Sequence, residues 1–406
     1  MKYKVIDLFA GCGGLLEGFM KAESYDVIAS VEWEKDPLIN LKNRLETRWK
    51  VKNADRKCLL MDIQQTEKLF KGWENDTKYG THIGLDQLVS ENGGVVDIII
   101  GGPPCQAYSI AGRARDEKNM KEDYRNFLFE SYLKVVNRYK PKIFIFENVP
   151  GILSAKPGEK KVTEMIYEEI EKIGYHITKD LKKLALLDLS NFGVPQVRKR
   201  VIILGVNKDY FNSPEEAVRY FYEEILVNYK KEKKVTLWNA IGDLPKLYPL
   251  SLECNKKSHS ESEVQIKNHL PRYHNKRDIQ IFKDLALDIE LGINKYKSSE
   301  AKNQLYYERT GNKTNVHRYH VLQKHEPSTT IIAHLNKDGW RFIHPESIQG
   351  RSITVREAAR LQSFSDSYEF ITSQGSNYKM IGNAVPPEFS YRLAKALSRF
   401  LKETIK

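Results

Sequence analysis

Short runs of β-branched residues alternate with helical patterns over the first half of the chain, and this alternation most constrains the fold. Strands are predicted at residues 3–9, 26–31, 95–100, 142–146 and 200–206. Apolar residues at helical spacing lie between several of them, for example over 124–139 and 162–173. Strands that alternate with helices form a mostly parallel sheet with helices on both faces. In such α/β folds, ligands bind at the carboxyl ends of the strands.

A glycine-rich turn follows the first predicted strand. It contains Phe9, Gly11, Gly13 and Gly14, and its glycines let the backbone approach a ligand closely. A nicotinamide dinucleotide site is the first alternative for such a turn. Its three-glycine pattern is not met, because leucines follow Gly14 where the last spaced glycine belongs.

Acidic residues follow successive strands in this part of the chain. Glu32 ends the second strand, Trp33 comes next, and Asp62 follows a short apolar run at 59–61. A carboxylate at the end of the second strand can accept from both hydroxyls of a ribose. Trp33 can stack on an adenine ring, and Asp62 can accept from the adenine amino group. No basic phosphate site is evident, so the pattern favours S-adenosylmethionine over a dinucleotide.

Cys105 lies in a proline-stiffened loop after the strand at 95–100. A lone cysteine is more often a small buried apolar residue, but a Pro-Pro corner would present the thiol at the edge of the sheet. Glu147 ends the next strand, and we expect it to face the same crevice as Cys105. For Arg198 and Arg200 the structural alternatives are a solvated basic edge or an arginine paired with Glu147.

A cysteine, a carboxylic acid and an arginine together match the needs of alkylation at C5 of a pyrimidine. A thiolate that adds to C6 makes C5 nucleophilic. A carboxylic acid that protonates N3 draws charge from the ring, and an arginine near O2 stabilises charge. The residues therefore indicate methyl transfer to a pyrimidine ring.

Six motifs resemble those of the cytosine-5 DNA methyltransferases, and they occur in the order of that family. They are DLFAGCGG (7–14), GGPPCQAYS (101–109), ENV (147–149), QVRKR (196–200), RSITVREAARLQSF (351–364) and GNAVPP (382–387). The resemblance implies an α/β fold of the Rossmann-like, S-adenosylmethionine-dependent methyltransferase class. It also implies a smaller, mixed target-recognition domain and flipping of the target base out of the DNA stack.

The resemblance also implies a role for each matching residue. Cys105 is the expected nucleophile, Glu147 the acid at N3, and Arg198 and Arg200 the residues that order the site and hold the base. The expected cofactor contacts are Phe9, Gly11, Gly13, Gly14, Glu32, Trp33, Asp62, Ile63, Pro104, Asn383 and Val385. Gln106 and Ser109 are the expected DNA contacts, and no metal is expected.

The same motifs suggest a division of the chain. We expect a catalytic domain at 1–206 and 366–406, a target-recognition domain at 207–350, and a connecting motif at 351–365.

A helix is predicted over 354–364, because Thr354 and Glu357 form a capping box. Ser365 stands where the family usually has proline. Residues 64–94 read as an insertion or an elaborated loop, to which no chemistry is assigned.

The formal net charge of +12 suggests a polyanionic partner, and the motifs make double-stranded DNA that partner. No two of the 4 cysteines have the close spacing of a zinc site or a redox pair. The chain begins with a buried-strand pattern, and no apolar run approaches membrane-spanning length. We therefore expect a cytoplasmic, bacterial, monomeric enzyme of the restriction–modification type, with a cognate restriction endonuclease acting separately.

Three other functions are considered. A cytosine-5 methyltransferase that acts on transfer RNA would share the fold and the nucleophile, although the long basic domain favours DNA. A catalytically silent DNA-binding homologue would be expected to lack Cys105 or Glu147, and both are present. A nicotinamide oxidoreductase would explain the glycine-rich turn alone.

Overall fold

The chain forms two compact units. The computed structural model describes residues 2–103, 128–156, 159–254, 256–262, 264–314 and 319–405. Unit 1 contains residues 1–193, 198–232 and 385–406, and unit 2 contains 194–197 and 233–384. The two boundaries therefore lie near 232 and 384, whereas the sequence suggested 206 and 365. The functions expected of the two parts remain predictions.

Unit 1 is built on an eight-stranded sheet, whose strands run in the order β3-β2-β1-β6-β7-β10-β8, with β9 paired to β10. The strands are β1 (Tyr3–Leu8), β2 (Tyr25–Glu32), β3 (Cys58–Leu60), β6 (Ile98–Gly101), β7 (Ile143–Asn148), β8 (Tyr175–His176), β9 (Leu186–Asp188) and β10 (Lys199–Asn207). The five strand positions predicted from β-branched runs are confirmed. Runs such as Ile98–Ile100 and Ile143–Ile145 are fully buried, as expected of strands covered on both faces.

The pairing of the strands places the predicted motifs at one edge of the sheet. The pairs β3–β2, β2–β1, β1–β6 and β6–β7 are all parallel. The ends of β1, β2 and β3 are therefore adjacent, and the segment after β6 starts beside the end of β7. Strand β10 is antiparallel to β7, so its first residues lie beside the last residues of β7. The expected mostly parallel sheet is confirmed.

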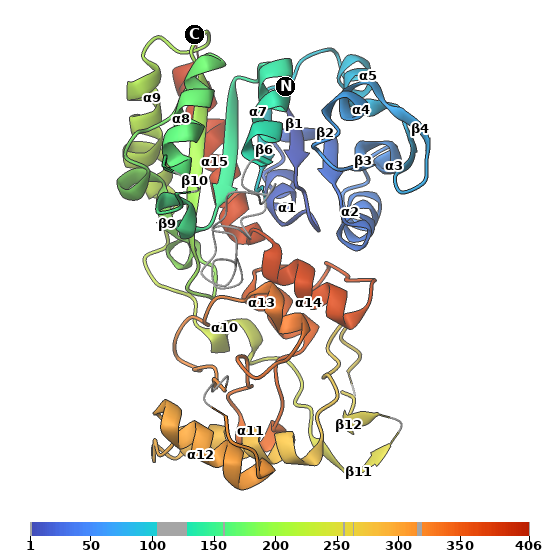
Figure 1. Ribbon diagram of the computed structural model, residues 1–406, viewed down its shortest axis with the longest axis vertical. Coiled ribbons are helices and arrows are strands. Elements are labelled where there is room, and N and C mark those ends of the chain that lie inside the picture. The colour runs from blue at the N-terminus through green and yellow to red at the C-terminus, as the bar shows by residue number, and fades with distance from the viewer. Residues whose placement is uncertain are drawn as a thin grey trace. The chain divides into compact units, whose positions relative to one another are not determined.

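Helices cover both faces of this sheet. Figure 1 shows α7 and α8 on the near face and α15 on the far face, where α15 packs against α1. The helices of unit 1 outside the 64–94 segment are α1 (Gly14–Lys21), α2 (Lys35–Thr47), α3 (Ala54–Lys57), α7 (Leu128–Tyr139), α8 (Val162–Lys172), α9 (Pro214–Tyr220) and α15 (Pro387–Thr404). Two of them, α7 and α8, confirm the helical patterns predicted at 124–139 and 162–173, within the described residues.

Residues 64–94 fold into regular structure rather than an open loop. They form α4 (Thr66–Lys71), the antiparallel hairpin of β4 (Trp73–Asp76) and β5 (Gly80–His82), and α5 (Gly84–Glu91). The whole segment lies between β3 and β6 in the chain. Its hairpin forms a small sheet of its own, separate from the central sheet.

Unit 2 combines helices with long connections. Its elements are α10 (Leu237–Ile241), β11 (Pro249–Cys254), β12 (Lys257–His259), α11 (Lys276–Glu290), α12 (Ser299–Thr310), α13 (Val355–Leu361) and α14 (Gln374–Asn383). A core around Phe282, Leu285 and Ile343 holds α11 and α12 to the connecting segments. Within the described ranges, no helix is long and apolar enough to cross a membrane.

Candidate active site

The turn between β1 and α1 leaves open space in front of its backbone. Phe9, Gly11 and Gly13 all have positive φ, at 56°, 55° and 78°, a region that glycine adopts without strain. No atom lies within 4 Å of the position that a Cβ on Gly11 would take. A Cβ on Gly13 would instead overlap the side chain of Leu41. Gly14 then begins α1 in a buried position.

Glu32 ties the end of β2 to this turn. Its Oε2 accepts from the backbone N–H of Gly11 at 2.8 Å, and its Oε1 accepts from those of Trp33 and Glu34 at 2.9 and 2.8 Å. Burial raises the pKa of Glu32 to about 7. The three backbone N–H donors have the opposite effect on this pKa, because they favour the charged carboxylate. Further donors, such as the hydroxyls of a ribose, would stabilise the carboxylate.

The remaining cofactor residues predicted near these strands lie around the same edge. The side chain of Trp33 is 41% exposed, which leaves its ring available for stacking. Asp62 and Ile63 follow β3, where the N–H of Met61 donates to the backbone oxygen of Glu32 at 3.0 Å. An exposed indole, two acidic side chains and open space beside Gly11 fit the adenosine part of S-adenosylmethionine.

Asp7 is a buried carboxyl group beside Glu32 to which the sequence analysis assigned no role. It lies inside β1 and is 1% exposed. Neither of its carboxyl oxygens has a hydrogen-bond partner among the residues that the structure describes. Burial, and then repulsion from Glu32, raise the pKa of Asp7 well above its ordinary value. A bound group that carries hydrogen-bond donors would satisfy these oxygens. An acidic residue within an otherwise apolar strand was the available signal.

Glu147, Arg200 and the start of the Cys105 loop lie together. Nε of Arg200 is 2.7 Å from Oε1 of Glu147, and both side chains are largely buried. A Cβ on Gly102 would lie 2.6 Å from Oε2 of Glu147, so a side chain at this position would displace the Glu147 carboxyl group. The side chain of Asn148 donates to the backbone oxygen of Pro103 at 3.4 Å. Both contacts hold the entry to the loop against the end of β7.

The other predicted catalytic and DNA-contacting residues divide into two groups. Arg198 is fully buried beside Arg200 and Glu147, and burial followed by the charge of Arg200 lowers its pKa. The residues of the loop itself lie outside the described residues: Pro104, Cys105, Gln106 and Ser109.

The two predicted cofactor residues of the last motif fall in different units. Asn383 is the exposed last residue of α14 in unit 2, whereas Val385 is buried in unit 1. Each residue is therefore described within its own unit.

Three of the motifs meet within unit 2. The side-chain amide of Gln196, from QVRKR, donates to the backbone oxygen of Leu361 at 2.8 Å and to the side chain of Gln362. Gln362 donates in turn to the backbone oxygens of Ile381 and Ala384, at 2.9 and 2.6 Å. All these contacts are buried, so two glutamines connect residues that are far apart in the sequence.

The motif at 351–364 is held by a buried ion pair. Arg351 donates from both terminal nitrogens to Glu357, at 2.7 Å each, and the two side chains are 0% and 1% exposed. Thr354 and Glu357 form the predicted capping box of α13, which is confirmed, although the helix ends at Leu361. Ser365 stands where proteins of the resembling family usually have proline. Its backbone oxygen accepts a hydrogen bond from the buried side chain of Arg356 at 3.2 Å.

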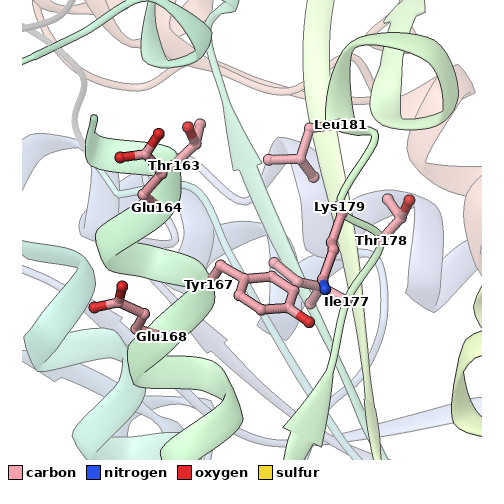
Figure 2. Close-up of a pocket in the computed structure, with 8 residues that line it drawn as sticks. All are labelled: Thr163, Glu164, Tyr167, Glu168, Ile177, Thr178, Lys179 and Leu181. Carbon is pink, nitrogen blue, oxygen red and sulfur yellow. The ribbon is translucent and has the colours of Figure 1, made fainter. Parts of the chain in front are cut away.

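A separate pocket of about 250 Å³ lies between α8 and residues 177–181 (Figure 2). Nζ of Lys179 is 5.3 Å from the centre of the Tyr167 ring, and both residues line it. Glu168, another lining residue, is already paired with Lys160. None of the predicted site residues lines this pocket, so we assign it no part in the chemistry.

Comparison with known proteins gives consistent matches along the whole chain. The family model of the C-5 cytosine-specific DNA methylases matches residues 3–399. The type II methyltransferase M.Bpa9945I of Bacillus paralicheniformis is 33% identical, covering 97% of this chain and 98% of that protein. M.DdeI of Desulfomicrobium norvegicum, also named a type II methyltransferase, is 30% identical, covering 98% and 89%.

Solved structures show the same fold at low sequence identity. A protein from a prophage of E. coli, described as a DNA modification methyltransferase, superposes with a TM-score of 0.61 at 23% identity, covering 99% of this chain and 100% of that one. The Dnmt2 methyltransferase of S. pombe gives a TM-score of 0.53 at 14% identity, covering 98% and 99%.

Proposed function

The chain belongs to the C-5 cytosine-specific DNA methylase family, and on that premise we propose how its residues carry out the reaction and on what substrate. The activity is that of a DNA (cytosine-5-)-methyltransferase, and the methyl donor is S-adenosylmethionine. We propose that the cytosine is flipped out of double-stranded DNA and bound covalently through C6 to Cys105. The observation that carries this proposal is the cluster of Gly102, Glu147 and Arg200, because it holds the start of the Cys105 loop against a carboxyl group.

The proposed reaction begins with the thiolate of Cys105, which forms a bond to C6 of the flipped cytosine. The electrons of the C5–C6 double bond shift towards N3, where Glu147 donates its proton. Arg200 orients Glu147 and stabilises charge on the base. S-adenosylmethionine, when bound, would supply a methyl group made electrophilic by its sulfonium, and the neutral thioether S-adenosylhomocysteine would be the leaving group.

The last steps restore the enzyme. Once C5 carries the methyl group, N3 returns its proton to Glu147. A base then removes the hydrogen of C5, and the electrons of that bond re-form the C5–C6 double bond. The bond between sulfur and C6 breaks, which frees the Cys105 thiolate and leaves 5-methylcytosine.

On the cofactor side, Glu32 would hold the ribose hydroxyls and Trp33 would stack on the adenine. The exposed indole and the backbone-anchored carboxylate support these roles. Asp62, Ile63 and the open backbone at Gly11 would complete the adenosine pocket, with Phe9, Gly13 and Gly14 shaping the turn. Pro104, Asn383 and Val385 are proposed as further cofactor contacts, and Gln106 and Ser109 as DNA contacts.

We expect Glu147→Gln to slow methyl transfer about a hundredfold, because an amide cannot deliver a proton to N3. The dissociation constant for S-adenosylmethionine should stay unchanged, since Glu147 lies outside the proposed adenosine pocket. Single-turnover transfer of labelled methyl groups and a binding titration measure the two effects. Glu171→Gln is a control, because Glu171 is a partly exposed carboxylate of unit 1 paired with Lys208. An unchanged transfer rate would remove Glu147 from the mechanism.

The names of the relatives support a role in a type II restriction–modification system, with a separate endonuclease that recognises the same site. The net charge of +12 supports a nucleic-acid substrate. Unit 2, with the basic stretches after residue 232, is proposed as the part that recognises the sequence, and the enzyme is proposed to act as a monomer.

The decisive experiment supplies labelled S-adenosylmethionine together with duplex DNA or transfer RNA. We expect label at C5 of cytosine in duplex DNA, in one sequence context that bisulfite sequencing reads. Label found in RNA alone would favour the transfer RNA methyltransferase instead. No label in either, with DNA still bound, would favour the silent homologue.

A further inference from the structure

We propose that Lys78 is a cofactor-positioning residue, which acts through the ring of Trp33. Lys78 lies at the tip of the hairpin formed by β4 and β5. This inference rests on the proposed function, because it takes Trp33 as the residue that stacks on adenine. It gives the inserted segment 64–94 a role at the adenosine end of the active site.

The tip of the hairpin is held in one conformation by its own hydrogen bonds. Oδ1 of Asp76 accepts from the backbone N–H groups of Lys78 and Tyr79, both at 3.0 Å. The indole N–H of Trp73 donates to the backbone oxygen of Tyr79 at 3.1 Å. Trp73 also stacks on His82 across the hairpin, with ring centres 5.1 Å apart. The turn that carries Lys78 is therefore preorganised.

The base of the hairpin is fixed to the rest of unit 1. A ring nitrogen of His82 forms a hydrogen bond with the backbone oxygen of Arg56 at 2.7 Å. Nζ of Lys68, from α4, lies 3.0 Å from Oδ2 of Asp76. A Cβ on Gly72 would lie 2.6 Å from the backbone oxygen of His82, so the strands leave no room for a side chain there. The hairpin is thus anchored at both ends.

This anchoring brings Lys78 to the proposed adenine-binding residue. Nζ of Lys78 is 5.9 Å from the centre of the Trp33 ring and 4.7 Å from that of Tyr79. Both distances lie within the range of cation–π attraction. The carboxylate of Asp62, the other proposed adenine contact, attracts the same ammonium group. Lys78 therefore lies close to both residues assigned to the adenine.

The partners of the neighbouring lysines differ from those of Lys78. Lys68 pairs with Asp76 and Lys71 pairs with Glu67. Lys78 forms no ion pair within 4 Å in the ranges that the structure describes, and its ammonium group interacts instead with the side chains of Tyr79 and Trp33. An ammonium group over the indole restrains the Trp33 side chain, which is partly exposed. A restrained ring loses less conformational entropy when adenine stacks on it.

Lys78→Met tests the proposal, because methionine keeps the length of the side chain and removes the charge. We expect the dissociation constant and the KM for S-adenosylmethionine to rise about three- to tenfold, while kcat at saturating cofactor changes little. Lys78→Arg should restore most of the affinity, because guanidinium also stacks on indole. Lys71→Met is the matched control and should bind the cofactor as the parent does.

A double-mutant cycle separates action through Trp33 from a general effect of charge. In a Trp33→Leu background, Lys78→Met should cost little further affinity. The inference fails if Lys78→Met binds the cofactor as tightly as the parent, or if its effect persists undiminished without Trp33. The proposed function fails separately, if the parent enzyme does not bind S-adenosylmethionine at all.

Discussion

Replacement of Cys105 by serine is expected to reduce methyl transfer about a thousandfold or more. A serine hydroxyl is scarcely ionised at neutral pH and adds poorly to C6 of a pyrimidine, whereas a thiol supplies a usable fraction of thiolate. Single-turnover transfer to duplex DNA measures the loss. DNA that contains 5-fluorocytosine at the target position should trap the parent covalently, since fluorine at C5 blocks the final proton removal. The variant should form no such adduct.

Two other cysteines, Cys12 and Cys58, are buried and do not compete with Cys105. Burial raises the pKa of Cys12 and that of Cys58 to about 12, so neither thiol supplies a nucleophile at neutral pH. Cys58→Ala is therefore the control, and it should retain both methyl transfer and covalent trapping. Trapping of Cys105→Ser, or loss of trapping in Cys58→Ala, would contradict the assignment of the nucleophile.

The central sheet and the motif positions could be predicted because buried parallel strands have a strong local signal. Runs such as Ile98–Ile100 are apolar throughout, and the motifs at 7–14, 101–109 and 147–149 lie where β1, β6 and β7 end. Parallel pairing then brings those ends to one edge, so the closeness of Gly11 to Glu32 follows from topology alone. For Arg200, the structure shows pairing with Glu147, which was one of the structural alternatives and is also compatible with the proposed catalytic role.

The inserted hairpin could not be predicted, because its strands are short and its stability comes from contacts between distant residues. Strand β5 has 3 residues, too few for an alternating pattern. The hairpin depends instead on the stack of Trp73 and His82 and on the bond from His82 to the backbone of Arg56. The approach of Lys78 to Trp33 depends on the same contacts, so no local pattern in the sequence indicates it. The boundaries of the two compact units also depend on long-range packing, so no local pattern in the sequence indicates them.

Glu357→Gln is expected to destabilise unit 2 by about 3–5 kcal/mol, because it leaves the buried charge of Arg351 without its counterion. Burial by itself would raise the pKa of Glu357, but the guanidinium of Arg351 overcomes that effect and holds the pKa well below its ordinary value. Oε2 of Glu357 also accepts from the backbone N–H of Thr354 at 2.7 Å. The substitution therefore weakens an ion pair and a helix cap together.

Urea unfolding at pH 7 measures this effect. Glu369→Gln is a matched control, since Glu369 pairs with Lys267 on the surface of unit 2, and its loss should cost no more than about 1 kcal/mol. Because the pKa of Glu357 is lowered in the folded state, its stabilising contribution is present above the pKa of the unfolded chain and is lost as the pH falls below it. The difference between parent and Glu357→Gln should therefore shrink in acid. A difference below about 1 kcal/mol at pH 7 would show that the ion pair contributes no more than a surface pair.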